Sequence, residues 1–154
     1  MNDYVKVLLC IYPRLETEAE RLERKMLFKA LSSMNHWLDP FSVAEDIIQI
    51  RATRNEYLGV RVALDRALSS LPKKGYEAIC YRFYHGEQPK DVSLRTVYRR
   101  TVAAIDKIAR QLEAEGYDKQ WFVKYCVRDE EMRYLYRFYR SQTPIRCRRV
   151  QNVK

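Results

Sequence analysis

Hydrophobic residues recur every three or four positions through most of this chain, which is the spacing of amphipathic α-helices. The first such segment covers residues 3–33, and its outer face interleaves acidic and basic side chains. Pro13 lies inside this segment. The pattern therefore predicts either a helix that ends near Tyr12 or one helix that is kinked there.

The second segment predicts one long helix over residues 40–71. Ser42 and Glu45 have the spacing of a capping box at its start, and Pro72 ends it. Gly59 is expected to weaken or bend the helix. Its inward stripe is predicted to contain Val43, Ile47, Ile50, Thr53, Tyr57, Val60, Leu64, Ala67, Leu68 and Leu71.

Two further helices follow at residues 76–84 and 94–115. The third stops at "HGEQP", which contains turn-forming Gly and Pro, and the fourth has Ser93 as N-cap and Gly116 as its stop. The third helix is expected to bury Tyr76, Ile79 and Phe83 against the fourth. The inward face of the fourth helix is predicted to contain Leu94, Val97, Thr101, Ala104, Ile105, Ile108 and Leu112.

The C-terminal part predicts two more helices, near residues 118–127 and 129–141, and then a basic tail that is poorly ordered when unbound. No stretch has the alternation of a strand, so the predicted fold class is all-α, a helical bundle. We expect four parts: an N-terminal helical pair at 1–72, a unit at 73–116, aromatic and basic helices at 117–143, and the tail at 144–154.

Composition supports a folded helical protein. The 154 residues are 47% hydrophobic and 32% charged, with only 4 Gly and 5 Pro. No apolar run is long enough to cross a bilayer, and "YVKVLLCIY" is too short for a signal peptide with its cleavage site. We therefore expect no membrane association and a cytoplasmic location. The cysteines lack the close pairs of a zinc site, so reduced thiols are expected; they are Cys10, Cys80, Cys126 and Cys147.

The net charge of +9 is unevenly distributed. Residues 1–72 carry 10 basic and 10 acidic side chains, whereas residues 73–112 carry 9 basic and 4 acidic. Residues 113–132 carry 3 basic and 6 acidic side chains, and residues 133–154 carry 7 basic and none acidic. Two concentrated positive segments behind a neutral front favour an anionic partner, nucleic acid above all, over a general role in solubility.

Residues 67–112 resemble region 4 of the sigma-70 family and of related small phage and mobile-element transcription regulators. The matching features are the Leu71-Pro72 pair, the helix "YEAICYRFYHGE" and the segment "SLRTVYRRTVAAIDKIARQL" in the place of the recognition helix. The opening "YVKVLLCIYPRLETEA" is similar to the first helix of small sigma-like proteins from clostridia and their phages. The resemblance implies a helix-turn-helix that binds double-stranded DNA. Only "PKDV" stands where the family has a supporting helix, so this helix-turn-helix is shortened.

The residues of the fourth helix agree with that expectation. An outward face near its N-terminal end, where recognition helices read base edges, holds Arg95, Thr96, Arg99 and Ala103. Flanking basic side chains suit phosphates, and Tyr98 either contacts the sugar-phosphate backbone or packs on the preceding helix. The candidate flanking residues are Arg100, Lys107 and Arg110 on this helix and Lys73 and Lys74 before the third.

The four letters "YRFY" occur at residues 81–84 and again at 136–139. The first copy closes the third helix, and its rings are expected to pack in the core. The second lies among more rings than one helix face can bury, so it predicts a surface for a protein partner or nucleic-acid backbone. The candidate residues of that surface are Arg133, Tyr136, Arg137 and Arg140.

Catalytic motifs are missing from the sequence. The two histidines stand apart from any catalytic cluster, and no phosphate loop, nucleophile elbow or H-E-x-x-H motif occurs. We therefore expect no enzyme, no metal and no cofactor. The first hypothesis is a DNA-binding transcription regulator of bacterial or phage origin. Its two N-terminal helices would form a homodimer or dock on RNA polymerase. The alternatives are an RNA polymerase-binding module that no longer reads DNA, and an RNA-binding protein that uses exposed tyrosines.

Overall fold

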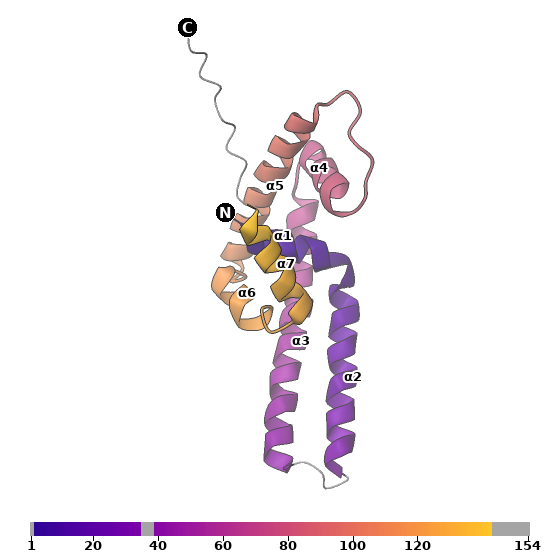
Figure 1. Ribbon diagram of the computed structural model, residues 1–154, viewed down its shortest axis with the longest axis vertical. Coiled ribbons are helices and arrows are strands. Elements are labelled where there is room, and N and C mark those ends of the chain that lie inside the picture. The colour runs from indigo at the N-terminus through magenta and orange to yellow at the C-terminus, as the bar shows by residue number, and fades with distance from the viewer. Residues whose placement is uncertain (1, 35–38, 143–154) are drawn as a thin grey trace.

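The computed structural model describes residues 2–34 and 39–142, and these residues form helices without any strand (Figure 1). The prediction of an all-α fold is confirmed. The helices are α1 (Asp3–Ile11), the 3₁₀ turn η1 (Tyr12–Arg14), α2 (Leu15–Met34), α3 (Pro40–Ser69), α4 (Lys73–Phe83), α5 (Leu94–Ala114), α6 (Lys119–Tyr125) and α7 (Glu130–Ser141). The basic tail lies outside the described residues.

The molecule consists of an arm and a body (Figure 1). The arm is α2 together with the part of α3 that runs antiparallel beside it. The body is formed by α1, α4, α5, α6, α7 and the C-terminal part of α3. With 30 residues, α3 is about 45 Å long, and this length lets one helix belong to both parts.

Helix α1 lies at the centre of the body. Its hydrophobic side chains are at most 3% exposed, namely Tyr4, Val5, Val7, Leu8, Leu9 and Ile11. They cover more than half of the helix circumference, and the half-buried Asp3, Lys6 and Cys10 occupy the rest. A helix with so broad an apolar face must be enclosed by several other elements. Here α3, α5, α6 and α7 enclose it, and they contribute Leu64, Ile108, Phe122 and Met132 to the same core.

The chain changes direction after α1, at Pro13. Proline has no N–H to donate and its ring clashes with the preceding turn, so the α-helix ends at Ile11 and a 3₁₀ turn follows. Of the two alternatives that the sequence left open, the helix that ends near Tyr12 is therefore correct. Helix α2 then starts in a new direction, as the start of the arm (Figure 1).

The helix caps are partly as predicted. Ser93 caps α5 by accepting a hydrogen bond from the Thr96 N–H at 3.3 Å, and Gly116 after α5 has a φ of +89°. The predicted cap of α3 is wrong. Asp39, not Ser42, is the N-cap, and its carboxylate accepts from the Ser42 N–H at 3.2 Å. Pro40 occupies the first helical position, where the missing N–H costs nothing.

Helix α3 is continuous through Gly59, so the predicted weak point does not interrupt it. A Cβ at this position would collide with the hydroxyl of Tyr117. Gly59 therefore lets the segment after α5 pack closely against α3. Its own backbone is helical, so the conformational freedom of glycine is not needed here.

Two residues predicted to face inward are exposed. Leu94 is 61% exposed because it lies in the first turn of α5, beyond the reach of the core, and Tyr76 is 46% exposed. The other predicted inward residues of α5 are buried. On α3, the predicted stripe is buried from Tyr57 onward, but Ile47, Ile50 and Thr53 are only half-buried because α2 covers them alone. Within the described residues, every helix is too short or too polar to cross a membrane.

Shortening a buried side chain of α1 tests the central role of this helix. We expect Leu8→Ala to lower the free energy of unfolding by about 3 kcal/mol, because it leaves a cavity in a site with no exposed surface. Val123→Ala, on the exposed side of α6, is the control and is expected to change it by less than about 0.5 kcal/mol. Urea unfolding followed by circular dichroism measures both. Equal effects would mean that α1 is not the core of the fold.

Candidate nucleic-acid interface

The first turn of α5 lies at the end of the body opposite the tip of the arm (Figure 1). Helix α4 packs beside it, and small residues bring the two helices close together. Gly75 is so near α5 that a Cβ there would lie 3.7 Å from the Cβ of Ala104. Thr101, buried between the helices, donates its hydroxyl proton to the Val97 carbonyl at 2.9 Å. This packing fixes which face of α5 points outward.

The ten residues between α4 and α5 contain a turn and no helix. At "PKDV", Lys90 and Asp91 form a turn in which Asp91 has a φ of +59°. The described chain therefore has a loop at the place where the resemblance implies a supporting helix. Helix α4 ends where His85 adopts a φ of +53° and the Gly86 N–H donates to the Cys80 carbonyl at 3.0 Å.

The outward face of α5 holds most of the predicted contact residues. Arg95, Tyr98, Arg99 and Ala103 are exposed, and Arg95 and Arg99 are one turn apart near the N-terminal end. Thr96 is half-buried, and its hydroxyl lies 3.0 Å from the hydroxyl of the capping Ser93.

The predicted flanking residues differ from one another. Lys73 and Lys74 are exposed in the first turn of α4, and Arg100 is half-buried. Lys107 is engaged elsewhere: its ammonium donates to the Ser70 carbonyl at 2.9 Å, at the end of α3. It therefore satisfies a helix terminus, in addition to any contact with a partner.

The pairing of charges distinguishes this face of α5 from helices α2 and α3. Five of the eight basic side chains of α2 and α3 form ion pairs, namely Arg21, Lys29, Arg54, Arg61 and Arg66. By contrast, none of the nine basic side chains at residues 73–110 has a carboxylate oxygen within 4.0 Å in the described part of the chain. The charge of α4 and α5 is therefore available to an external anion.

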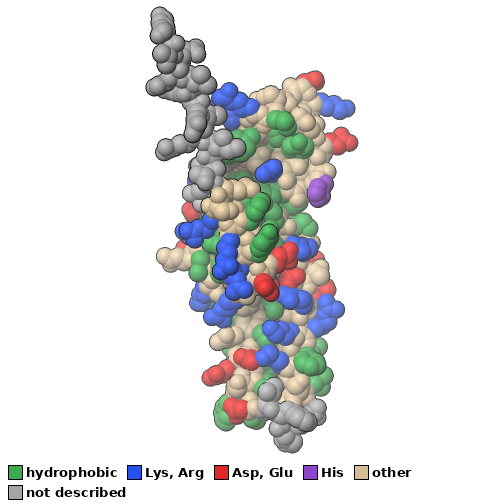
Figure 2. All heavy atoms as spheres, viewed as in Figure 1, with side chains coloured by type: hydrophobic (Ala, Val, Ile, Leu, Met, Phe, Trp, Pro, Cys, Tyr) green, Lys and Arg blue, Asp and Glu red, His purple; other side chains and the backbone are tan. Residues whose placement is uncertain are grey.

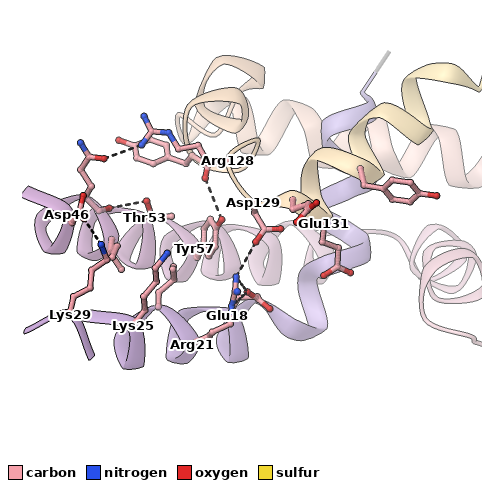
Figure 3. Close-up of a pocket in the computed structure, with 16 residues that line it drawn as sticks. Glu18, Arg21, Lys25, Lys29, Asp46, Thr53, Tyr57, Arg128, Asp129 and Glu131 are labelled. Carbon is pink, nitrogen blue, oxygen red and sulfur yellow. Dashed lines mark hydrogen bonds and ion pairs between the residues drawn. The ribbon is translucent and has the colours of Figure 1, made fainter. Parts of the chain in front are cut away.

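A cleft of about 900 Å³ lies between the arm and the connection from α6 to α7 (Figure 3). Arg21 bridges its walls, because its guanidinium pairs with Glu18 at 2.8 Å and with Asp129 at 3.2 Å. Asp129 also caps α7 by accepting from the Met132 N–H at 3.0 Å. Acidic and basic groups neutralise one another here, so we assign the cleft a structural role. The residues that line the cleft are distant in sequence, so no local sequence pattern predicts it.

The predicted partner surface on α7 needs correction. Tyr136 is only 8% exposed, and its ring packs on Phe122 with 5.2 Å between the centroids. It is part of the core because α6 folds back over that side of α7. Arg137 and Arg140 are exposed and Arg133 is half-buried. The exposed rings of this helix are Tyr134 and Phe138, which the sequence interpretation did not select.

The first "YRFY" packs largely as predicted. Phe83 and Tyr84 are half-buried, and the Tyr84 ring lies 6.1 Å from that of Tyr12. Burial raises the pKa of the Tyr84 hydroxyl, which has no hydrogen-bond partner within the described residues. Arg82, which precedes Phe83 in the sequence, is exposed.

The chain matches no protein-family model, no curated protein and no solved structure. In the described ranges 2–34 and 39–142, no group of three or more His, Cys, Asp or Glu side chains is placed to hold a metal ion. A function for this protein therefore has to be inferred from the geometry of α4 and α5.

The end of α4 offers a matched pair of substitutions. His85→Gly is expected to stabilise the protein by about 1 kcal/mol, because glycine adopts a positive φ without the steric cost of a side chain. Gly86→Ala is expected to destabilise it by about 1–3 kcal/mol, because the new Cβ would lie 2.9 Å from the Cys80 carbonyl carbon. Thermal unfolding of both variants measures the difference. A His85→Gly variant less stable than the parent, or a Gly86→Ala variant as stable as the parent, would contradict this geometry.

Proposed function

We propose that this protein is a DNA-binding transcription regulator that inserts the N-terminal half of α5 into the major groove. The observation that carries the proposal is the set of exposed, unpaired arginines at the free end of α5. Arg95 and Arg99 are one turn apart, and the small Ala103 follows one turn later on the same face. A helix of this kind can approach base edges closely, and arginine recognises guanine through two hydrogen bonds.

Charge in the neighbouring helix supports the same orientation. The N-terminus of α4 has no side-chain cap, and Lys73 and Lys74 occupy its first turn. Free N–H groups at a helix N-terminus, with two ammonium groups beside them, suit a phosphate. In this arrangement α4 contacts the backbone of the duplex while α5 contacts the bases, which is the division of roles in a helix-turn-helix.

A second candidate is a protein-interaction module that binds RNA polymerase. The observation that favours it is the loop at residues 84–93, which replaces the supporting helix and removes one element that would brace α5 against DNA. In this alternative the contacts come from the C-terminal half of α7, where Arg137, Phe138 and Arg140 are exposed. Arg95 and Arg99 would then be dispensable.

A DNA-binding experiment distinguishes the two candidates. Fluorescence anisotropy across a salt series would compare the parent with Arg95→Ala/Arg99→Ala on random duplex and on fragments from the gene's own neighbourhood. We expect the parent to prefer some fragments. The variant should lose about 1–3 kcal/mol of that preference for each base-specific contact, while a weaker salt-dependent background remains.

Lys119→Ala/Lys124→Ala is the matched control, because it removes the same charge from exposed positions on α6. It should keep the preference of the parent. If the parent shows no preference, or if both double variants behave alike, α5 does not read DNA. Binding to RNA polymerase that depends on Arg137 and Arg140 would then support the second candidate.

A further inference from the structure

The distal half of the arm carries an apolar face that is left uncovered by the described residues. Six large hydrophobic side chains there are 61–83% exposed, namely Leu27, Phe28, Leu31 and Met34 on α2 and Phe41 and Ile48 on α3. Figure 2 shows hydrophobic side chains at this end of the molecule. In the body, exposed hydrophobic residues are spread over several helices.

Helix periodicity places the two contributions on one side of the arm. On α2, Leu27 lies one position after Met26, which faces α3; on α3, Ile48 lies one position after Ile47, which faces α2. Because the helices are antiparallel, the residue that follows an inward-facing residue points to the same side of the arm on both helices. Leu27 and Ile48 therefore lie on one side. The cleft of Figure 3 supports this assignment, because its residues Lys25 and Asp46 lie one position before the same inward pair and line the opposite side.

The size of this face is that of a protein interface. Five of the six side chains point to this side, namely Leu27, Leu31, Met34, Phe41 and Ile48, whereas Phe28 lies further round α2. If a large side chain offers about 150–200 Å², these five at their exposures present on the order of 600 Å² of apolar surface. Monomeric proteins rarely leave more than about 300–600 Å² of contiguous apolar surface in water. A stable interface buries about 800 Å² on each partner. About 65% of a homodimer interface is apolar, which is roughly 500 Å² of those 800 Å². The face is therefore large enough for a stable contact.

Charge indicates the occupant. Helices α2 and α3 each carry four basic and four acidic side chains, so the arm has no net charge, although the whole chain carries +9. A nucleic acid or an acidic protein would be met by positive charge, which the chain places elsewhere. A neutral apolar face on a pair of helices is complementary to another such face, as in an isologous interface.

We propose that a second copy of this chain packs on the face, so that two arms form a four-helix bundle. The charge of the two bodies determines whether the two arms run parallel or antiparallel. Residues 70–142 carry 15 basic and 10 acidic side chains, and parallel arms would place two such positive bodies side by side. Antiparallel arms place the bodies at opposite ends. One consequence rests on the proposed function: the two α5 helices would then hold two separate DNA segments.

Sedimentation velocity of the full chain tests the dimer. The parent is expected to sediment as a particle of twice its 18.5 kDa at about 50 µM. Leu31→Glu/Ile48→Glu is expected to be a monomer, because the dissociation constant of the dimer rises at least about 100-fold. Val123→Glu/Tyr134→Glu adds the same charge at exposed positions outside the face and should remain dimeric. Circular dichroism checks that all three chains fold, since each substituted side chain is exposed.

The outcomes are distinct. A monomeric parent, a dimer that survives Leu31→Glu/Ile48→Glu, or open-ended growth with concentration would overturn the proposal. Small-angle X-ray scattering tests the direction: antiparallel arms require a maximum dimension well above that of the monomeric variant, and an equal dimension would exclude them. A short duplex titrated onto the parent and the monomeric variant separates the two proposals. If neither chain binds it, DNA binding fails while the sedimentation result still decides the dimer.

Discussion

The burial of α1 is the interaction on which the rest of this structure depends. Nine residues near the N-terminus supply six nearly inaccessible hydrophobic side chains, and they are covered by helices from the middle and the end of the chain. The contact joins segments that are far apart in sequence: the Cys10 thiol lies 3.0 Å from the Tyr139 hydroxyl, and the Tyr4 ring lies 6.1 Å from that of Phe122. Without α1, the inner surfaces of α5, α6 and α7 would have no common partner.

This arrangement separates the parts of the chain that hold the fold from the parts that are free to bind. In the body, the inner face of α5 is committed to α1, α3 and α4, and its arginines are left on the outside without carboxylate partners. Along α2 and α3, most basic groups pair with carboxylates, while the apolar side chains on one side of the arm stay exposed. The two surfaces therefore differ in chemistry: one suits an anion and the other an apolar helix face.

The two sides of the arm differ because one side is covered and the other is not. The connection between α6 and α7 reaches the side that carries Arg21, and Asp129 holds it there through an ion pair. Polar residues on that side form ion pairs with one another around the cleft. The opposite side receives no element of the described body, and its hydrophobic residues remain available. Long helices that extend beyond their own core commonly require such a partner, because α2 alone cannot cover the full circumference of α3.

The sequence by itself determined the helices. Their period of three to four residues, Pro13, Ser93 and Gly116 predicted where most of them begin and end, because capping and proline chemistry act locally. It also predicted the inner face of α5 from Val97 to Leu112, since one side of that helix is strongly apolar. The candidate interface followed from the charges that remained on the other side.

Only the tertiary structure decided which hydrophobic residues are covered. Leu31 and Leu64 both fit the hydrophobic period of a helix. Leu31 is exposed in the distal half of the arm, however, and Leu64 is fully buried in the body. Tyr136 was expected at the surface and is in the core, because α6 folds back over it, and Leu94 was expected in the core and is in water. Periodicity fixes the direction of a side chain on its own helix, whereas burial depends on whether a distant segment arrives on that side.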